Sequence, residues 1–294
     1  SDNSYGGSTG SQVVPIETNA IDGGNSVLAR DWDRYLADVA QANTVIENID
    51  KVPDASLTAT ERRQWKAEAK IFRSLVWFDM VRLWGNIPVV TKEGTDITAE
   101  NIEEVYPLYY PKQTAPADTY AQIIKDLTEA IDDAPANNAG DKTVLSKSVA
   151  KALLAKAYAE KPARDYTKVL QYCNDVIADG FKLNPNFGDI YALNSAGTDL
   201  KNRSTGESIL EVNFFPGGGN WVTWMFGKDL LDPEANFSWA KWVTPTRDLI
   251  AAFTAENDNI RKNESIVYYQ ASWSNYYPSS SYPFMYKMRS AVHS

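Results

Sequence analysis

The sequence predicts a mainly α-helical protein, in which tetratricopeptide-like helix pairs form a scaffold and a loop-rich region with short β-strands follows. Three observations support this fold class. Apolar residues recur at helical spacing over roughly the first 180 residues, short links join neighbouring helices, and small and aromatic side chains lie at the expected helix contacts. Beyond about residue 180, glycine, proline and aromatic residues interrupt the helical periodicity.

Composition excludes several classes of protein. The 294 residues contain 29 lysines and arginines against 38 aspartates and glutamates, which gives a formal net charge of −9. Such an acidic chain is a poor match for nucleic acid or anionic lipid, so we expect no nucleic-acid partner. One cysteine and one histidine leave no internal disulfide and no Cys/His zinc site. Cys173 lies in an apolar helical pattern, and we expect it to pack in the core.

The first two helices are predicted from apolar residues spaced three and four positions apart. One begins at Asp31, after an irregular segment over residues 1–26. The second spans residues 61–84, with Thr60 as its N-cap and Gly85 as the left-handed residue that ends it. Its apolar surface is wider than one stripe, so we expect it to pack against neighbours on more than one side.

Three more helices are predicted after a polar, proline-marked connection over residues 91–116. They span about 118–133, 146–160 and 165–178, and the second is rich in small residues that suit close packing. Short links between them indicate helix pairs. Because their spacing is not a regular repeat of about 34 residues, an ordinary helical bundle is the alternative.

The region after Phe181 has a different character. Residues 208–214 alternate between apolar and polar side chains and predict a strand, and one helix is predicted at about 246–254. Residues 214–294 carry 17 of the 35 aromatic residues of the chain and five of its nine tryptophans. Glycines and prolines lie among them, which places most of these rings on loops.

These loop aromatics form the candidate ligand site. An aromatic ring on a loop can stack on the apolar face of a sugar, while a neighbouring amide fixes the orientation of a hydroxyl group. The alternative is a small core beneath long loops, because tryptophan is highly buried on average. The candidate ligand-binding residues are Trp221, Trp224, Trp239, Trp242, Trp273, Asn220 and Tyr276.

The residue pattern favours a protein without catalytic residues. Adjacent acids such as Asp132 and Asp133 are typical of solvated helix ends, and no pair of carboxylates is singled out for glycoside hydrolysis. The run over residues 256–259 offers oxygen ligands of the kind that calcium prefers, but no EF-hand pattern frames it, so we interpret it as a solvated turn. We therefore expect no cofactor and no metal site.

Several stretches resemble the SusD/RagB-like proteins of Bacteroidetes. The stretch Ala42-Asn43-Thr44-Val45-Ile46 and the later EAKIFRSLVWFDMVRLWGNIPVV resemble the two motifs that mark this family. Four further stretches resemble the family in the same order, from about Trp32 to Arg261 for the whole match. They are SKSVAKALLAKAYA, YTKVLQYCNDVIADGFKL, GESILEVNF and WVTPTRDLIAAFTAENDNIR.

The resemblance implies a non-catalytic lipoprotein on the extracellular face of the outer membrane, with an N-terminal lipid anchor that is absent from this chain. Such a protein binds an oligosaccharide or polysaccharide and delivers it to a SusC-like TonB-dependent transporter. Residues 1–294 would form a single SusD-like domain, incomplete at both ends, with a helical scaffold over 30–180 and a ligand-binding region over 181–294. The alternatives are import of a peptide or another nutrient, a purely structural helical scaffold, and a glycosidase.

Overall fold

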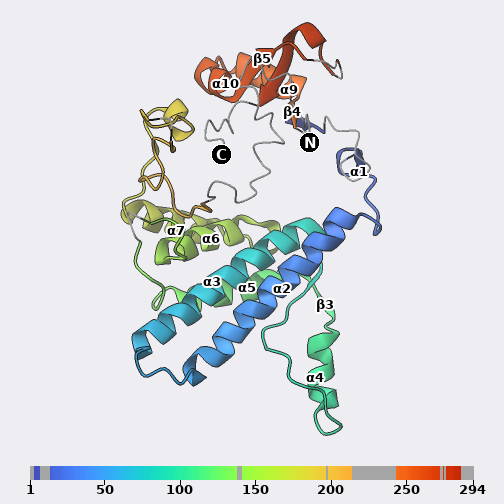
Figure 1. Ribbon diagram of the computed structural model, residues 1–294, viewed down its shortest axis with the longest axis vertical. Helices are drawn as coiled ribbons and strands as arrows, with labels where there is room; N and C mark the ends of the chain where they lie inside the picture. The colour runs from blue at the N-terminus through green and yellow to red at the C-terminus, as the bar shows by residue number, and fades with distance from the viewer. Residues whose placement is uncertain are drawn as a thin grey trace. The chain divides into compact units, whose positions relative to one another are not determined.

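The chain folds into two compact units in the computed structural model (Figure 1). We call Leu28–Lys182 with Gly206–Glu211 the helical unit. We call Ser1–Val27 with Leu183–Thr205 and Val212–Ser294 the mixed unit. The structure describes residues 3–6, 14–137, 141–196, 198–213, 243–271, 274 and 276–285.

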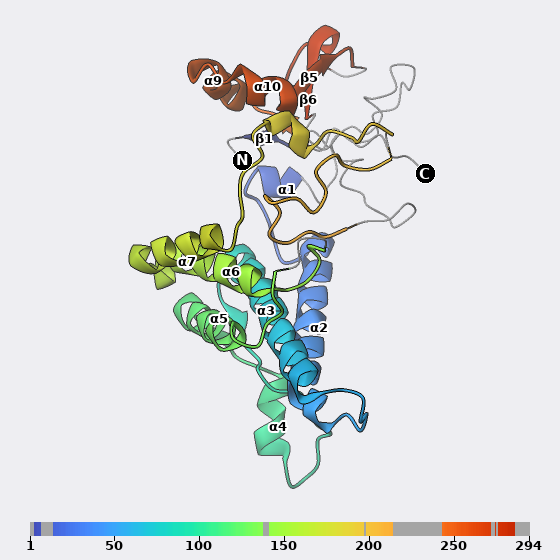
Figure 2. The same ribbon diagram turned by 90° about the vertical axis from the view of Figure 1, so that its left-hand side faces the viewer.

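Helices dominate the helical unit, and the predicted mainly α-helical, tetratricopeptide-like fold class is confirmed. Helix α3 packs on α5, α5 packs on α6, and α6 packs on α7 (Figures 1 and 2). Each helix thus buries one face on the next, as in helical repeat proteins. The helices are α2 (Ser26–Asn48), α3 (Ala59–Trp84), α4 (Ile102–Tyr109), α5 (Pro116–Ala130), α6 (Lys147–Ala159) and α7 (Tyr166–Ala178).

Helix α2 begins earlier than predicted. Its first residue is Ser26 instead of Asp31. The side chain of Asn25, just before the helix, accepts a hydrogen bond from Val27 N at 3.1 Å and so satisfies one free N–H group of the first turn. The prediction rested on apolar spacing alone. Because a polar side chain starts the helix, that spacing placed its first residue five positions too late.

Helix α3 begins with a capping box at Thr58, not with the predicted cap at Thr60. The hydroxyl of Thr58 accepts a hydrogen bond from Glu61 N at 3.2 Å, and the Glu61 carboxylate accepts one from Thr58 N at 2.8 Å. At the other end, Gly85 has φ of 76°, as expected for a glycine that ends a helix.

The connection predicted over residues 91–116 contains a helix that the sequence did not reveal. Helix α4 occupies Ile102–Tyr109, and Pro107 inside it makes the segment resemble a loop in sequence. Strand β2 (Ile87–Pro88) pairs antiparallel with β3 (Gln113–Thr114), so the two ends of this connection lie together.

The strand predicted over residues 208–214 does not form in its described part, residues 208–213. Ile209 and Leu210 instead pack against the core of the helical unit. Glu211 N donates a hydrogen bond to Lys142 O at 2.8 Å. The alternating pattern therefore belongs to a segment that packs apolar side chains on the helices and, over its described residues, does not pair with another strand.

Helix α3 lies at the centre of the core. Ile71, Trp77 and Met80 have no exposed surface, and buried residues on several of its sides confirm the prediction of packing on more than one side. Apolar residues near the two ends of the helix are exposed, however. Trp65 is 48% exposed and Leu83 is 60% exposed.

Helix α7 exposes one face that carries Cys173 and several apolar residues. Cys173 is exposed, so the expectation that it packs in the core is wrong. Tyr166, Leu170 and Ile177 lie at helical spacing from it and are 66%, 63% and 65% exposed. Helix α6 covers α7 on the other side, where Val176 is buried.

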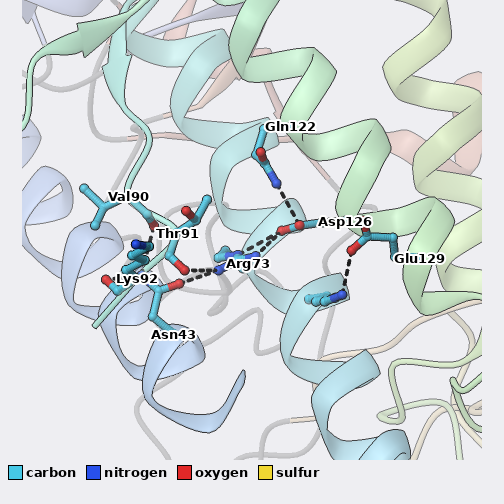
Figure 3. A network of polar contacts seen from close by, with 9 residues as sticks. Asn43, Arg73, Val90, Thr91, Lys92, Gln122, Asp126 and Glu129 are labelled. Atoms are coloured by element: carbon cyan, nitrogen blue, oxygen red, sulfur yellow. Dashed lines mark hydrogen bonds and ion pairs between the residues drawn. The ribbon is translucent and has the colours of Figure 1, made fainter. Parts of the chain in front are cut away.

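A buried ion pair joins α3 and α5 (Figure 3). The Nε and Nη2 atoms of Arg73 donate to Asp126 Oδ2 at 2.8 and 2.6 Å, and the two side chains are 3% and 2% exposed. Gln122 donates to the other carboxylate oxygen at 2.9 Å. Burial raises the pKa of the Asp126 carboxyl, while the Arg73 guanidinium opposes that shift by favouring the ionised form.

The same arginine reaches α2 and the segment after β2. Arg73 Nη1 donates to Asn43 Oδ1 at 2.5 Å and to Thr91 O at 3.3 Å. Asn43 Nδ2 donates to Val90 O at 2.9 Å and to Lys92 O at 3.3 Å (Figure 3). One side chain therefore links three helices and one loop, and both Asn43 and Arg73 belong to the stretches that carry the sequence resemblance.

The mixed unit consists of short elements. The helix predicted near residues 246–254 is confirmed, whereas two other short helices and the positions of two strand pairs were not predicted. Strand β1 pairs antiparallel with β4. Strand β5 pairs antiparallel with β6, and the two lie side by side in Figure 2. The elements are β1 (Ser4–Tyr5), α1 (Val14–Glu17), β4 (Thr244–Pro245), α9 (Arg247–Ala255), α10 (Asn259–Ser265), β5 (Ile266–Tyr269) and β6 (Tyr282–Met285).

The buried pair gives a first prediction. Replacement Arg73→Ala should lower the free energy of unfolding by about 3–5 kcal/mol, because it leaves the buried Asp126 carboxylate without its partner. The matched control is Arg63→Ala, which breaks an ion pair with Asp133 whose side chains are 55% and 44% exposed. That control should cost no more than about 1 kcal/mol. Urea unfolding measures both, and equal losses would contradict the prediction.

Two half-buried carboxylates on α3 give a second prediction. Burial raises the pKa of Glu68 and of Asp79 in the folded chain. As pH rises, these carboxyl groups therefore ionise first in the unfolded chain. The contribution that they make to the free energy of unfolding is fully present below the unfolded pKa and is lost as pH rises through the folded pKa. Glu68→Gln and Asp79→Asn should each raise the thermal midpoint at neutral pH. The gain should shrink toward about pH 4, and a gain that stays constant across this range would argue against burial as its cause.

Candidate functional site

One candidate ligand-binding residue, Tyr276, lies within the described part of the chain. The other six lie outside the described residues, and their role stays a prediction. They are Trp221, Trp224, Trp239, Trp242, Trp273 and Asn220. Tyr276 and the residues that hold it form the described part of the candidate site.

The backbone of Tyr276 is held in a conformation that costs energy. Its φ of 68° lies in the left-handed region, which is rare for a residue with a large side chain. Arg247, the first residue of α9, donates a hydrogen bond from Nη2 to Tyr276 O at 2.6 Å. Strained residues are concentrated at functional sites, so this geometry marks Tyr276 as a candidate.

The ring of Tyr276 is fixed by two residues from the other end of the chain. Tyr5 of β1 stacks on it with ring centroids 4.2 Å apart and an angle of 12° between the planes. The phenol of Tyr276 donates to Glu17 Oε1 at 3.2 Å. Despite these contacts Tyr276 is 38% exposed, so a ring held on several sides still meets solvent.

A layer of buried and half-buried residues supports this pair. Tyr277 lies 6.3 Å from the Tyr5 ring, and its hydroxyl donates to Pro245 O at 2.7 Å. The Tyr277 ring also contacts Tyr282, which is fully buried and whose hydroxyl lies 3.3 Å from Thr244 Oγ1. The pairing of β1 with β4 brings these residues together, because Tyr5 lies opposite Thr244.

The environment of the two tyrosines favours their neutral forms. Burial raises the pKa of Tyr276, and the nearby Glu17 carboxylate adds to the shift. Burial, with a smaller effect of Tyr5, raises the pKa of Tyr277 to about 12. At neutral pH both hydroxyls therefore carry their protons and donate hydrogen bonds, to Glu17 and to Pro245.

Sequence reasoning missed the residues that hold Tyr276. Tyr5 and Glu17 lie in an N-terminal segment that the sequence presented as irregular, and about 260 positions separate them from Tyr276. Arg247 was visible only as the start of the predicted helix near 246–254. Helix and strand periodicities relate only residues that are close in sequence, so these positions become neighbours only through the pairing of β1 with β4.

Residues 256–258 of the oxygen-rich run form the turn between α9 and α10, and Asn259 is the first residue of α10. Asn257 has φ of 54°, and Asp258 caps α10 by accepting a hydrogen bond from Arg261 N at 3.1 Å. Asp258 also forms an ion pair with the Arg261 side chain. Among the described residues, no group of three or more His, Cys, Asp or Glu side chains is arranged to hold a metal ion.

The arrangement offers a partly exposed aromatic ring beside a carboxylate and a guanidinium. A ring of this kind can stack on the apolar face of a sugar, and Glu17 and Arg247 are placed to accept from and donate to its hydroxyl groups.

A separate finding concerns membranes. Within the described part of the chain, every helix is too short or too polar to cross a lipid bilayer.

Comparison with known proteins identifies similar chains. Residues 9–159, more than half of the chain, match the SusD-like_3 family, described as "Starch-binding associating with outer membrane". A SusD-like protein of Bacteroides ovatus is 27% identical over 217 residues, which make up 70% of this chain and 36% of that protein. The chain thus spans about a third of the length of this curated relative.

Solved structures share the fold. A laminarin-binding SusD-like protein has a TM-score of 0.71 at 19% identity, over 98% of this chain and 65% of its own. A structure with a xylogluco-oligosaccharide has a TM-score of 0.70 at 20% identity, over 97% of this chain and 57% of its own. A SusD superfamily protein of Bacteroides thetaiotaomicron has a TM-score of 0.69 at 18% identity, over 95% and 59%.

The half-buried phenol of Tyr277 gives a third prediction. Because the pKa of Tyr277 is raised to about 12 in the folded chain, stability present below the ordinary tyrosine pKa of 10.0 should be lost as pH rises toward the folded pKa. Tyr277→Phe should lose about 1 kcal/mol at neutral pH, with the bond to Pro245. As pH rises from 10 toward the folded pKa, the free energy of unfolding of this variant should fall less than that of the wild type.

Urea unfolding at a series of alkaline pH values measures this difference. The control is Tyr166→Phe, at a tyrosine that is 66% exposed. This replacement should leave the alkaline profile unchanged. A profile that is the same for Tyr277→Phe and the wild type would contradict the structural account of this hydroxyl.

Proposed function

Because the chain belongs to the SusD-like family, as the stretches around Asn43 and Arg73 indicate, we propose that it binds a glycan and does not alter it. The printed description of the family, starch binding in association with the outer membrane, supports this proposal. So do the names of two proteins of the same fold, one laminarin-binding and one solved with a xylogluco-oligosaccharide.

The observation that carries the proposal is the held but partly exposed ring of Tyr276. The ring is fixed by Tyr5 and Glu17, and Arg247 holds the backbone that carries it, so the residue loses little conformational freedom when a ligand stacks on the ring. A glycan of neutral hexoses suits the site best, since the chain has a net charge of −9 and the ring stands beside a carboxylate. The five tryptophans and Asn220 of the predicted site would extend this surface.

The role proposed here is binding and not catalysis. Cleavage of a glycosidic bond requires two carboxyl groups at a set separation across the bond. The contacts of Tyr276 include one carboxylate, that of Glu17, which accepts a hydrogen bond from the phenol. The binding role needs no cofactor and no metal.

A further part of the proposal concerns the protein's place in the cell. We propose a lipid-anchored position on the extracellular face of the outer membrane, where the bound glycan is delivered to a SusC-like TonB-dependent transporter. The family description, which includes association with the outer membrane, supports the location. Delivery to a transporter would explain how a protein that binds a glycan without altering it contributes to nutrient uptake.

The fourth prediction tests the ligand site by isothermal titration with malto-, laminari- and xylogluco-oligosaccharides. Tyr276→Asn removes the ring and tolerates the left-handed backbone, so the loss reports the ring and not misfolding. Affinity for the preferred glycan should fall about tenfold, or about 1.4 kcal/mol. Tyr276→Phe keeps the stacking ring and should bind within a factor of about three of the wild type.

The control is Tyr166→Asn on α7, where the ring is 66% exposed and belongs to the other unit. Its affinity should equal that of the wild type. If no glycan binds while a peptide library does, the nutrient is a peptide and the glycan proposal is wrong. Release of a shorter sugar during incubation would establish a glycosidase.

A further inference from the structure

Helix α4 and the loop before it form an acidic aromatic tip, which we define as residues 93–111. Figures 1 and 2 show α4 standing apart from the bundle of α2, α3 and α5 within the helical unit. Ile102, Tyr106, Tyr109 and Tyr110 lie on one face of this helix and are 46%, 50%, 49% and 66% exposed. An apolar face of this size on a projecting helix requires an explanation.

The rings of the tip are fixed in place. Tyr109 donates a hydrogen bond to Thr95 O at 3.0 Å, and its ring lies on the backbone at Gly94. A side chain at position 94 would place its Cβ 3.0 Å from the ring, so the glycine permits this close approach. Tyr106 and Tyr110 stack on each other with centroids 4.7 Å apart.

The loop that carries the tip is also ordered by its own side chains. Asn101 accepts a hydrogen bond from Thr98 N at 2.7 Å and donates one to Asp96 O at 2.9 Å. The tyrosines are thus held in position before any partner arrives. Prior order of this kind lowers the conformational entropy lost on binding.

The tip carries charge of one sign. Residues 93–111 contain five carboxylates and no lysine or arginine. Glu93 accepts hydrogen bonds from Thr44 and Asn48 of α2, which leaves four carboxylates on the projecting part. Glu103 lies beside the tyrosine face in the helix, and a hydrogen bond from Thr98 lowers the pKa of Glu100, which favours its ionised form. A partner that fits this surface must therefore present positive charge around an apolar recess.

From this combination we infer that the acidic aromatic tip docks into a partner protein whose surface carries arginine and lysine side chains around an apolar recess. Tyrosine is enriched at the energetic centres of protein interfaces, and arginine stacks on its ring. The tip projects, whereas small-ligand sites are concave, and this favours a protein over a glycan as its occupant. The inference is independent of glycan binding at Tyr276.

The test is photo-crosslinking of the full-length protein in the cells that make it. Tyr110→p-benzoylphenylalanine places the reactive group on the tip. Tyr166→p-benzoylphenylalanine places it on α7, where the exposed fraction of the native tyrosine is the same 66%. The protein attached at position 110 but not at 166 is identified, its modified peptide is sequenced, and the purified partner is titrated with wild type and variants.

The inference is supported if the modified peptide is flanked by arginine or lysine and the affinity of the purified partner falls about tenfold with Tyr110→Ala. Glu103→Lys should weaken the same complex more than Glu103→Gln. The inference is overturned by equal labelling at both positions, by attachment of a glycan, or by unchanged affinity of Tyr110→Ala. Oligosaccharide titration of these variants reports the Tyr276 site separately, so the two proposals can fail independently.

Discussion

The helical unit depends on one buried charge and on how completely it is satisfied. A guanidinium in the core is tolerated only when its donors are paired, and Arg73 directs its donors to Asp126, Asn43 and Thr91. Asn43 must be an amide for this purpose, since it accepts from the arginine with its oxygen and donates to two backbone carbonyls with its nitrogen. A carboxylate at that position would face those carbonyls without a donor. The network thus sets the register of α2 against α3.

Apolar periodicity predicted the helices well because burial of one face is what stabilises them. It failed where a polar side chain determines the first residue of a helix, or where a neighbouring element determines whether an apolar face is buried. Asn25 and Thr58 start α2 and α3 through capping bonds that no apolar spacing reports. Cys173 follows the helical pattern and yet is exposed, because a pattern shows which face is apolar but not whether a neighbour covers it.

The candidate site was less accessible from the sequence than the fold. The choice of Tyr276 rested on its place in an aromatic, glycine- and proline-rich region. What makes it a candidate in the structure is its backbone angle and its contacts with Tyr5 and Glu17. Those contacts depend on pairing between segments at opposite ends of the chain, and such pairing is a property of the whole fold. The six other predicted residues lie outside the described part of the chain.

The exposure of Cys173 has a practical consequence. It is the single thiol among 294 residues, and it stands on the surface of α7 within the helical unit. A maleimide reagent would therefore attach one fluorophore or spin label per molecule without any engineered cysteine. Paired with a second label introduced in the mixed unit, this native handle would report the distance between the two units in solution, and how that distance responds to an added sugar.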